Sequence, residues 1–386
     1  MAVYGVLLPL PFDDVFDYEA DEELKIGQIV IVPFGREELA GVVFKLGKSA
    51  DIDIKKIKKI KEVPDLGRLS DALLEFIKKT AAYNMAPLGL VLKMVLGQKT
   101  NQLPKEKIYL YSLHIKNENL KGVRITETRK AVFDFFETHL EATKEEIISA
   151  THVSDSVISA MIKSGFLTKK EVLCNEQTKE QIVNLDKKAT LTEEQQRAAD
   201  ILVKKVGFGF SATLLDGVTG SGKTEVYFEA VAKALEMKKQ VLVLVPEISL
   251  TTQWLKRFET RFGVTPYIWH SEVGIKDKAR VWKAVMQNKA KVIVGARSAL
   301  FLPFYNLGII VVDESHDHSF KQESLVTYQG RDMAVLRAHL EKIPVILQPQ
   351  RLIWKRLSTL KKENTTAFNL KNVLPRRSCP KLRLLI

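Results

Sequence analysis

The residues best suited to chemistry form a glycine-rich loop, Gly217-Val218-Thr219-Gly220-Ser221-Gly222-Lys223-Thr224. Its spacing, G-x-x-x-x-G-K-[ST], is that of a P-loop, in which glycines such as Gly217, Gly220 and Gly222 let backbone N–H groups surround phosphates. Lys223 is expected to contact the β- and γ-phosphates, and Thr224 to ligate Mg²⁺. The loop therefore predicts ATP and Mg²⁺ as cofactors.

A pair of acids follows an apolar run further along the chain. Asp313 and Glu314 come directly after Ile309–Val312. An acid at the end of a parallel strand near a P-loop can hold Mg²⁺ from the other side, so Asp313 is predicted as a catalytic and metal-binding residue. Glu314 is predicted to orient and deprotonate the attacking water. By itself an Asp-Glu pair is a weak signal, because strands often end in solvated acids, but downstream of a P-loop it is strong.

A glutamine upstream of the P-loop is a candidate nucleotide contact. Gln195 lies in the segment Leu191-Thr192-Glu193-Glu194-Gln195. Its amide carries both a donor and an acceptor, which could read the edge of an adenine. The same segment also has the pattern of a helix start with Thr192 as the N-cap, and the two interpretations are compatible.

Strands and helices alternate around these residues. The strand candidates are short aliphatic runs at 212–215, 241–245, 292–294, 309–312 and 345–347. Runs of this kind are typical of parallel strands buried on both faces. The region 176–347 is therefore predicted to be an α/β lobe with a parallel sheet, and its ligands are expected at the carboxyl ends of the strands.

Two smaller modules are predicted before this lobe, which makes the chain multidomain. Residues 1–104 open with short β-rich segments broken by Gly and Pro, which indicates a small barrel or sandwich, followed by a helix over 69–83. Residues 105–175 give three helical segments and then a strand, the pattern of a winged helix. Many winged helices bind DNA, although others only pack or bind partners.

Composition narrows the function classes. The formal net charge of +13 suits a polyanionic partner, although a lysine-rich organism would also produce basic proteins. The sequence has no run of 18 apolar residues, so no membrane span is predicted. The N-terminus lacks the pattern of a signal peptide, and the expected compartment is therefore the cytoplasm. The two cysteines, Cys174 and Cys379, are too few for a disulfide framework or a cysteine-built zinc site.

Several further motifs carry a resemblance to a known family. Pro246–Thr251 and Gly295–Phe301 are similar to two DNA-contact motifs of superfamily-two helicases, and Asp313–Asp317 is similar to their D-E-E-H-D motif, with Ser315 at the third place. The region 319–332 resembles an aromatic-rich loop that couples DNA binding to ATP hydrolysis, although Val326 and Thr327 replace its usual Pro-Arg. The lobe thus resembles the RecA-like first motor lobe of the primosomal replication-restart DNA helicases.

The resemblance extends to the N-terminal module through Val15–Tyr18, Pro33–Gly35 and Pro87–Gly89. In that family the module binds the 3′ end of a nascent DNA strand at a stalled fork. The resemblance implies a 3′-terminal nucleotide pocket made of Phe16, Asp17, Tyr18, Gly35 and Lys58. It also implies DNA contacts from Arg297 and Lys321. Without the resemblance, Phe16 and Tyr18 would equally suit core packing on one face of a strand.

The pattern departs from the family after Leu347. The expected G-S-A-T-P-S motif is replaced by Gln348-Pro349-Gln350-Arg351, and residues 348–386 form an aberrant basic tail without periodicity, as a frameshift or early truncation would produce. We do not find the family's second motor lobe, which carries an arginine finger, in the sequence. We also do not find the zinc module, although the family is expected to bind zinc. A single lobe is expected to bind ATP without turning it over well.

The resemblance implies an ATP-dependent 3′ to 5′ DNA helicase of replication restart that assembles the primosome at stalled forks. The chain itself is expected to bind ATP and forked DNA without unwinding it. One alternative is a non-enzymatic fork-DNA-binding module with a vestigial ATP site, and another is an ATP-binding nuclease or repair subunit that needs a partner lobe. The implied partners are forked or single-stranded DNA, primosome proteins and single-strand-binding protein, with no membrane.

Overall fold

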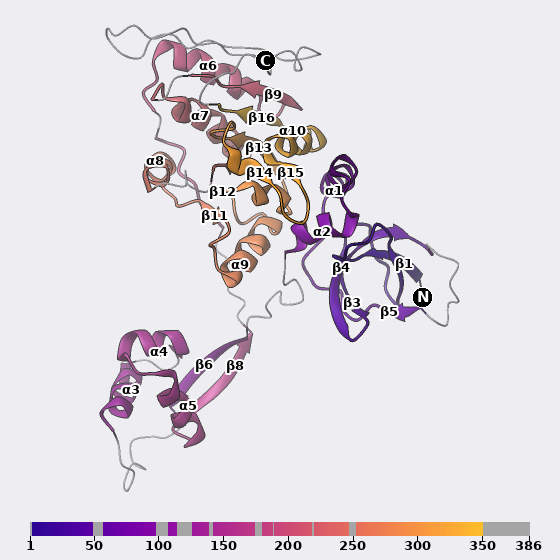
Figure 1. Ribbon diagram of the computed structural model, residues 1–386. Coiled ribbons are helices and arrows are strands. Elements are labelled where there is room, and N and C mark those ends of the chain that lie inside the picture. The colour runs from indigo at the N-terminus through magenta and orange to yellow at the C-terminus, as the bar shows by residue number, and fades with distance from the viewer. Residues whose placement is uncertain are drawn as a thin grey trace. The chain divides into compact units, whose positions relative to one another are not determined.

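The computed structural model describes residues 2–48, 57–97, 107–113, 126–138, 142–173, 180–187, 189–217, 220–246 and 252–349 (Figure 1). The chain divides into two compact units, one made of 1–101 with 178–386 and the other of 102–177. Within the described residues, no helix has the length and apolar character needed to cross a membrane. The segment 247–251 and the predicted tail from residue 350 onwards lie outside the described residues.

The N-terminal module is built on one curved sheet. Its strands are β1 (Ala2–Leu7), β2 (Phe16–Ala20), β3 (Ile29–Phe34), β4 (Glu37–Leu46) and β5 (Lys58–Lys59), in the order β3-β4-β1-β2-β5. A bridge between Ile31 and Glu62 then joins the segment after β5 back to β3, so the sheet curls into a small barrel. Its interior is filled by alternating apolar side chains such as Val6, Val30 and Val43.

Two helices follow the barrel, α1 (Asp71–Asn84) and α2 (Leu88–Leu96). Helix α1 begins where the Ser70 side chain accepts a hydrogen bond from the Leu73 N–H, and it ends at Met85, whose φ is 49°. This helix matches the one predicted over 69–83. Its buried face carries Phe76 and Ile77, and it packs on α10 of the lobe described below.

The second unit contains β6 (Lys107–Leu113), α3 (Glu127–Thr138), β7 (Ala142–Thr143), α4 (Lys144–Thr151), α5 (Asp155–Lys163) and β8 (Leu167–Leu173). Its three-stranded sheet has the order β7-β6-β8, and β6 pairs with β8 antiparallel along seven residues. The core is apolar, with Val132, Ile147 and Ile158 fully buried. A helical cluster beside an antiparallel sheet of this kind is compatible with a winged helix.

The remaining lobe is α/β, as predicted. Its elements are α6 (Glu193–Lys205), β9 (Ser211–Leu214), α7 (Lys223–Glu236), β10 (Gln240–Leu244), α8 (Thr252–Phe262), β11 (Tyr267–Trp269), α9 (Ile275–Met286), β12 (Val292–Gly295), η5 (Arg297–Phe301), β13 (Leu307–Val312), η6 (His318–Phe320), β14 (Lys321–Gln322), β15 (Tyr328–Gln329), α10 (Gly330–Glu341) and β16 (Pro344–Leu347). Six strands form one sheet in the order β11-β12-β10-β13-β16-β9. All the pairings within this sheet are parallel.

Helices cover both faces of this sheet because its strands are apolar on both sides. Val241, Val243 and Val311 share a core with residues of α6, α7 and α8. Leu242 and Ile310 are equally buried but alternate to the opposite face, where α10 packs on β13 and β16. The parallel arrangement brings the ends of β9 and β13, which carry the P-loop and the acid pair, to the same edge with β16 between them.

Candidate functional site

The glycine-rich loop connects β9 to α7. Gly220 and Gly222 have φ values of 80° and 77°, a left-handed conformation that glycine adopts at little cost. A side chain at Gly222 would also meet Gln195, since a Cβ there would lie 2.4 Å from its Nε2. The Ser221 Oγ is buried without a hydrogen-bond partner among the described residues. These features leave the loop backbone and one hydroxyl available to an anion at the N-terminus of α7.

Lys223 is the first residue of α7 and is only 6% exposed. Its Nζ donates a hydrogen bond of 2.5 Å to the Gly217 carbonyl. Burial lowers the pKa of Lys223, while the carboxylates of Glu314, Asp313 and Asp216 oppose that shift. The ammonium group of Lys223 therefore lies between the loop and the acids, where it could donate hydrogen bonds to a bound phosphate chain.

The acid pair begins where β13 ends. Asp313 is 6% exposed, and its Oδ2 accepts a 2.9 Å hydrogen bond from the Tyr227 hydroxyl while its Oδ1 accepts one of 2.8 Å from the Glu314 N–H. Burial raises the pKa of Asp313 to about 6, and the hydrogen bond from Tyr227 opposes that rise. The carboxylate is thus held by two donors in a site that disfavours its charge, so a cation is the natural further partner.

Glu314 adopts a left-handed backbone conformation, with a φ of 47°. Non-glycine residues with such values are uncommon and cluster at functional sites. One of its carboxylate oxygens lies 3.5 Å from the Nδ1 of His316. The turn thereby places a second carboxylate next to Asp313.

The oxygen donors fit a hard cation bound together with phosphates. Thr224 supplies a hydroxyl and Asp313 a carboxylate, the kinds of ligand Mg²⁺ takes when phosphates and waters complete its shell. Such a site needs no large ligand cluster, and no group of three or more His, Cys, Asp or Glu side chains in the described ranges is placed to hold a metal. The two cysteines that bear on the zinc prediction lie outside those ranges.

Gln195 lies against the phosphate loop. Its Oε1 accepts the Thr192 N–H at 2.8 Å, which completes a capping box with Thr192 and confirms Thr192 as the N-cap of α6. Its Nε2 donates to the Ser221 carbonyl at 2.9 Å. Both ends of the amide therefore bond to the chain's own backbone, and one N–H and one lone pair of the amide are left for a further partner.

Arg297, one of the two predicted DNA-contact residues of the lobe, joins two segments. The Nε of Arg297 donates to the Gln322 Oε1 at 2.7 Å, and its guanidinium also donates to the Ser319 carbonyl. The rings of Phe301 and Tyr328 make an edge contact at 5.3 Å. Lys321 is exposed and pairs with Glu323 at 2.6 Å. The turn η5 and the 318–328 loop thus form one joined surface.

The predicted 3′-end residues occupy neighbouring positions in the barrel. Phe16 and Tyr18 share one face of β2, where Phe16 contacts Phe34 at 5.3 Å and the buried Tyr18 donates to the Pro33 carbonyl at 3.2 Å. Burial raises the pKa of Tyr18 to about 12.

The remaining members of the predicted pocket surround these two. Lys58 is paired with Tyr18 in the parallel register of β2 and β5, and Gly35 lies in the turn after Phe34 with open space beside its Cα. Asp17 points to the opposite face of β2, because side chains alternate along a strand. The structure therefore gathers the aromatic, glycine and lysine positions, and it directs the carboxylate of Asp17 away from them.

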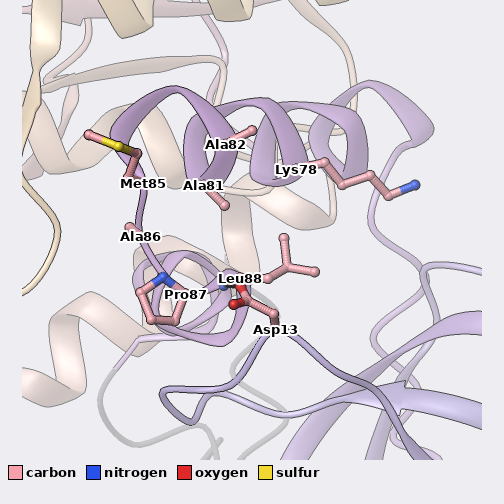
Figure 2. Close-up of a pocket in the computed structure, with 8 residues that line it drawn as sticks. All are labelled: Asp13, Lys78, Ala81, Ala82, Met85, Ala86, Pro87 and Leu88. Atoms are coloured by element: carbon pink, nitrogen blue, oxygen red, sulfur yellow. Dashed lines mark hydrogen bonds between the residues drawn. The ribbon is translucent and has the colours of Figure 1, made fainter.

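A hollow lies elsewhere in the N-terminal module. It measures about 560 Å³ and is lined by Asp13, Lys78, Ala81, Ala82, Met85, Ala86, Pro87 and Leu88 (Figure 2). The Asp13 Oδ1 accepts the Leu88 N–H at 2.8 Å, at the start of α2. None of the residues predicted to bind the DNA end lines this hollow.

Sequence reasoning missed Tyr227 and Trp254, which bond to each other beside Asp313. Tyr227 stands three residues after Thr224 in α7, and helical residues at that spacing share a face. This spacing was the available signal. Trp254 gave none, because its contact with Tyr227 depends on how α8 packs against α7.

Two families match this chain. The 3′DNA-binding domain (3′BD) family matches residues 5–97, and the DEAD/DEAH box helicase family matches residues 192–347. The second match spans the phosphate loop and the acid pair. The chain therefore combines a 3′DNA-binding domain with a DEAD/DEAH box helicase domain.

The similar proteins are replication restart proteins. The chain is 33% identical to replication restart protein PriA of Rickettsia conorii over 90% of its own length and 42% of that protein. It is 33% identical to the Haemophilus influenzae PriA over 90% of this chain and 49% of the other, and 29% identical to the Bacillus subtilis PriA over 87% and 51%. The chain is a relative of PriA, and it spans about half the length of these relatives.

Among solved structures, RecG bound to a three-way DNA junction overlaps 52% of this chain and 23% of that chain, with 17% identity. The TM-score of this overlap is 0.33.

Proposed function

We propose that the chain is the ATP-binding and DNA-end-binding portion of a replication restart helicase. The observation that carries the proposal is the joining of the P-loop, the buried Lys223 and the Asp313–Glu314 pair at one edge of a parallel sheet. The match of residues 5–97 to a 3′DNA-binding domain in the same chain supports a DNA substrate.

In this proposal each group at the nucleotide site has one task. Lys223 and the N–H groups of the loop bind the phosphates, and Thr224 and Asp313 hold Mg²⁺, which neutralises phosphate charge when bound. Glu314 accepts the proton of the attacking water. Gln195 keeps the loop in place through the Ser221 carbonyl, and its second N–H would contact the base.

The DNA contacts are divided between two surfaces. The pocket for a 3′-terminal nucleotide is proposed to use Phe16, Tyr18, Gly35 and Lys58, with Asp17 accepting a hydrogen bond from the 3′-hydroxyl after a local change in its direction. Arg297 and Lys321 are proposed to contact the DNA backbone. The unit over 102–177 is proposed to be a winged helix, and primosome proteins and single-strand-binding protein remain proposed partners.

We expect the 386-residue polypeptide by itself to bind Mg-ATP and forked DNA without separating strands. Translocation requires two lobes that close on the nucleotide, and the described residues contain one. A missing arginine finger would lower the rate of hydrolysis by about 10³–10⁵. Strand separation that depends on Lys223 would contradict this expectation.

A single-turnover ATPase assay with and without forked DNA tests the proposal. We expect slow, Mg²⁺-dependent hydrolysis that forked DNA accelerates and that Glu314→Gln abolishes while ATP binding is kept. A hydrolysis rate that forked DNA does not change would favour a vestigial ATP site on a fork-binding module. Cleavage of the DNA under these conditions would favour a nuclease or repair subunit, and absence of ATP binding would refute the proposal.

A further inference from the structure

A chain of buried hydrogen bonds runs from α8 through α7 to the acid pair. The Trp254 Nε1 donates to the Tyr227 hydroxyl at 2.9 Å, and that hydroxyl donates to the Asp313 Oδ2 at 2.9 Å. Tyr227 is fully buried, and Trp254 and Asp313 are almost so. The Tyr227 hydroxyl is therefore shielded from bulk water, and its partners are the two side chains.

The direction of this chain is fixed by chemistry. An indole N–H can only donate, so the Tyr227 oxygen must accept from Trp254 and its single proton is directed to Asp313. Thr224 precedes Tyr227 by three residues in α7, a spacing that places the two on the same face of the helix. The phenol thus bonds to Asp313 and shares a helix face with Thr224, the other residue proposed to hold Mg²⁺.

Aromatic packing holds the phenol and the indole in place. The rings of Trp254 and Phe258 are stacked at 5.5 Å with an angle of 12°, and Phe228 contacts both Trp254 and Tyr227 edge-on. Interlocked rings of this kind leave few rotamers open. The donor presented to Asp313 is therefore preorganised.

We propose that Tyr227, oriented by Trp254, is a positioning residue that sets the Asp313 carboxylate for Mg²⁺. The inference rests on the proposed ATP site and adds to it a support that acts on metal affinity rather than on phosphate affinity. Partners that orient metal ligands in this way change metal affinity by about 10–100-fold when removed.

The test is calorimetric titration of the full chain with a non-hydrolysable ATP analogue, once with Mg²⁺ and once with EDTA. Tyr227→Phe removes only the hydroxyl. We expect it to weaken binding of the Mg²⁺ complex by about tenfold, while the metal-free analogue binds within about twofold of wild type. Tyr4→Phe is the matched control, because Tyr4 is a buried tyrosine of the barrel whose hydroxyl accepts the Leu24 N–H.

Equal losses with and without Mg²⁺, or no loss in either titration, would overturn the inference. Trp254→Phe is the second variant and decides the matter if Tyr227→Phe does not fold. It frees the Tyr227 proton to point elsewhere and should reproduce the selective loss in smaller measure. If the wild-type chain binds no analogue at all, the proposed ATP site is refuted. If both variants bind the Mg²⁺ complex as tightly as wild type does, only the positioning role of Tyr227 is refuted.

Discussion

The ammonium group of Lys223 is enclosed by the loop that it is expected to serve. It bonds to the Gly217 carbonyl, and three carboxylates counter the effect of burial on its pKa. A bound phosphate chain would replace the Gly217 carbonyl as the acceptor of this hydrogen bond, and the bond would be stronger because both groups are charged. The structure therefore holds the Lys223 ammonium group where the γ-phosphate is expected.

Lys223→Ala should weaken Mg-ATP binding by about 3 kcal/mol, the upper range for a hydrogen bond to a charged group. Isothermal titration calorimetry measures this directly. Lys233→Ala is the control, since Lys233 lies on the same helix and forms a surface ion pair with Glu236. Equal ATP affinity of Lys223→Ala and wild type would remove Lys223 from the site.

Asp17→Ala tests the pocket for the DNA end. We expect wild type to prefer a fork with a 3′-hydroxyl over one with a 3′-phosphate, and the variant to lose that preference while backbone binding, which depends on salt, persists. Fluorescence anisotropy with both forks provides the measurement. Glu19→Ala, on the same face of β2, is the control. If wild type binds both ends equally, no such pocket exists.

The chemistry of the phosphate loop could be predicted because it is local. The spacing from Gly217 to Thr224 specifies a P-loop without knowledge of the fold, and the run before Asp313 identifies a strand end. The bond between Tyr227 and Trp254 could not be predicted, since it joins two helices through tertiary packing. The direction of Asp17 was within reach of sequence reasoning, because side chains alternate along a strand and Phe16 and Tyr18 share one face. The resemblance supplied residue identities without this alternation.

At the scale of elements, the sequence specified most of the parallel sheet. Strands β10, β12, β13 and β16 are largely aliphatic and almost wholly buried, and all were predicted. Strand β9 was also predicted, although it is mostly half-buried at the edge of the sheet. Strand β11 was missed because Tyr267–Trp269 is only three residues long and half-buried at the sheet edge. The sequence also gave no sign that α1 of the barrel module would pack on α10 of the lobe.

That helix contact is centred on Phe76 of α1. Its ring lies 5.3 Å from Phe301 of η5, and the guanidinium of the fully buried Arg337 in α10 lies 5.5 Å from the ring. Arg337 also donates to the Leu300 carbonyl. The N-terminal module and the turn that carries Arg297 thus share one packed core.

Phe76→Ala should destabilise this core by about 3–5 kcal/mol, the usual cost of removing a buried phenylalanine ring. Urea unfolding followed by circular dichroism measures the change. Lys79→Ala is the matched variant on the exposed face of α1 and should change stability by less than about 0.5 kcal/mol. A Phe76→Ala protein as stable as wild type would mean that α1 does not dock as described.

At the scale of the whole molecule, two proposed binding functions are joined in one basic chain. The net charge of +13 favours association with a polyanion, and the compact unit that contains the barrel also contains the nucleotide site. Contacts from α1 reach η5, and contacts from η5 reach the 318–328 loop that follows the acid pair. DNA bound at the proposed end pocket of the barrel would be connected to Asp313 through these packed contacts.

The most direct test of this account is the affinity of the chain for Mg-ATP, measured by calorimetry with and without a fork that carries a 3′-hydroxyl. Coupling between sites is reciprocal, and typical coupling energies correspond to about 5–150-fold in affinity. We predict that the fork changes the affinity for Mg-ATP by at least about fivefold. We also predict that Asp17→Ala removes the part of this effect that depends on the 3′-hydroxyl. An affinity for Mg-ATP that is identical with and without the fork would contradict the claim that the DNA site and the nucleotide site are energetically coupled.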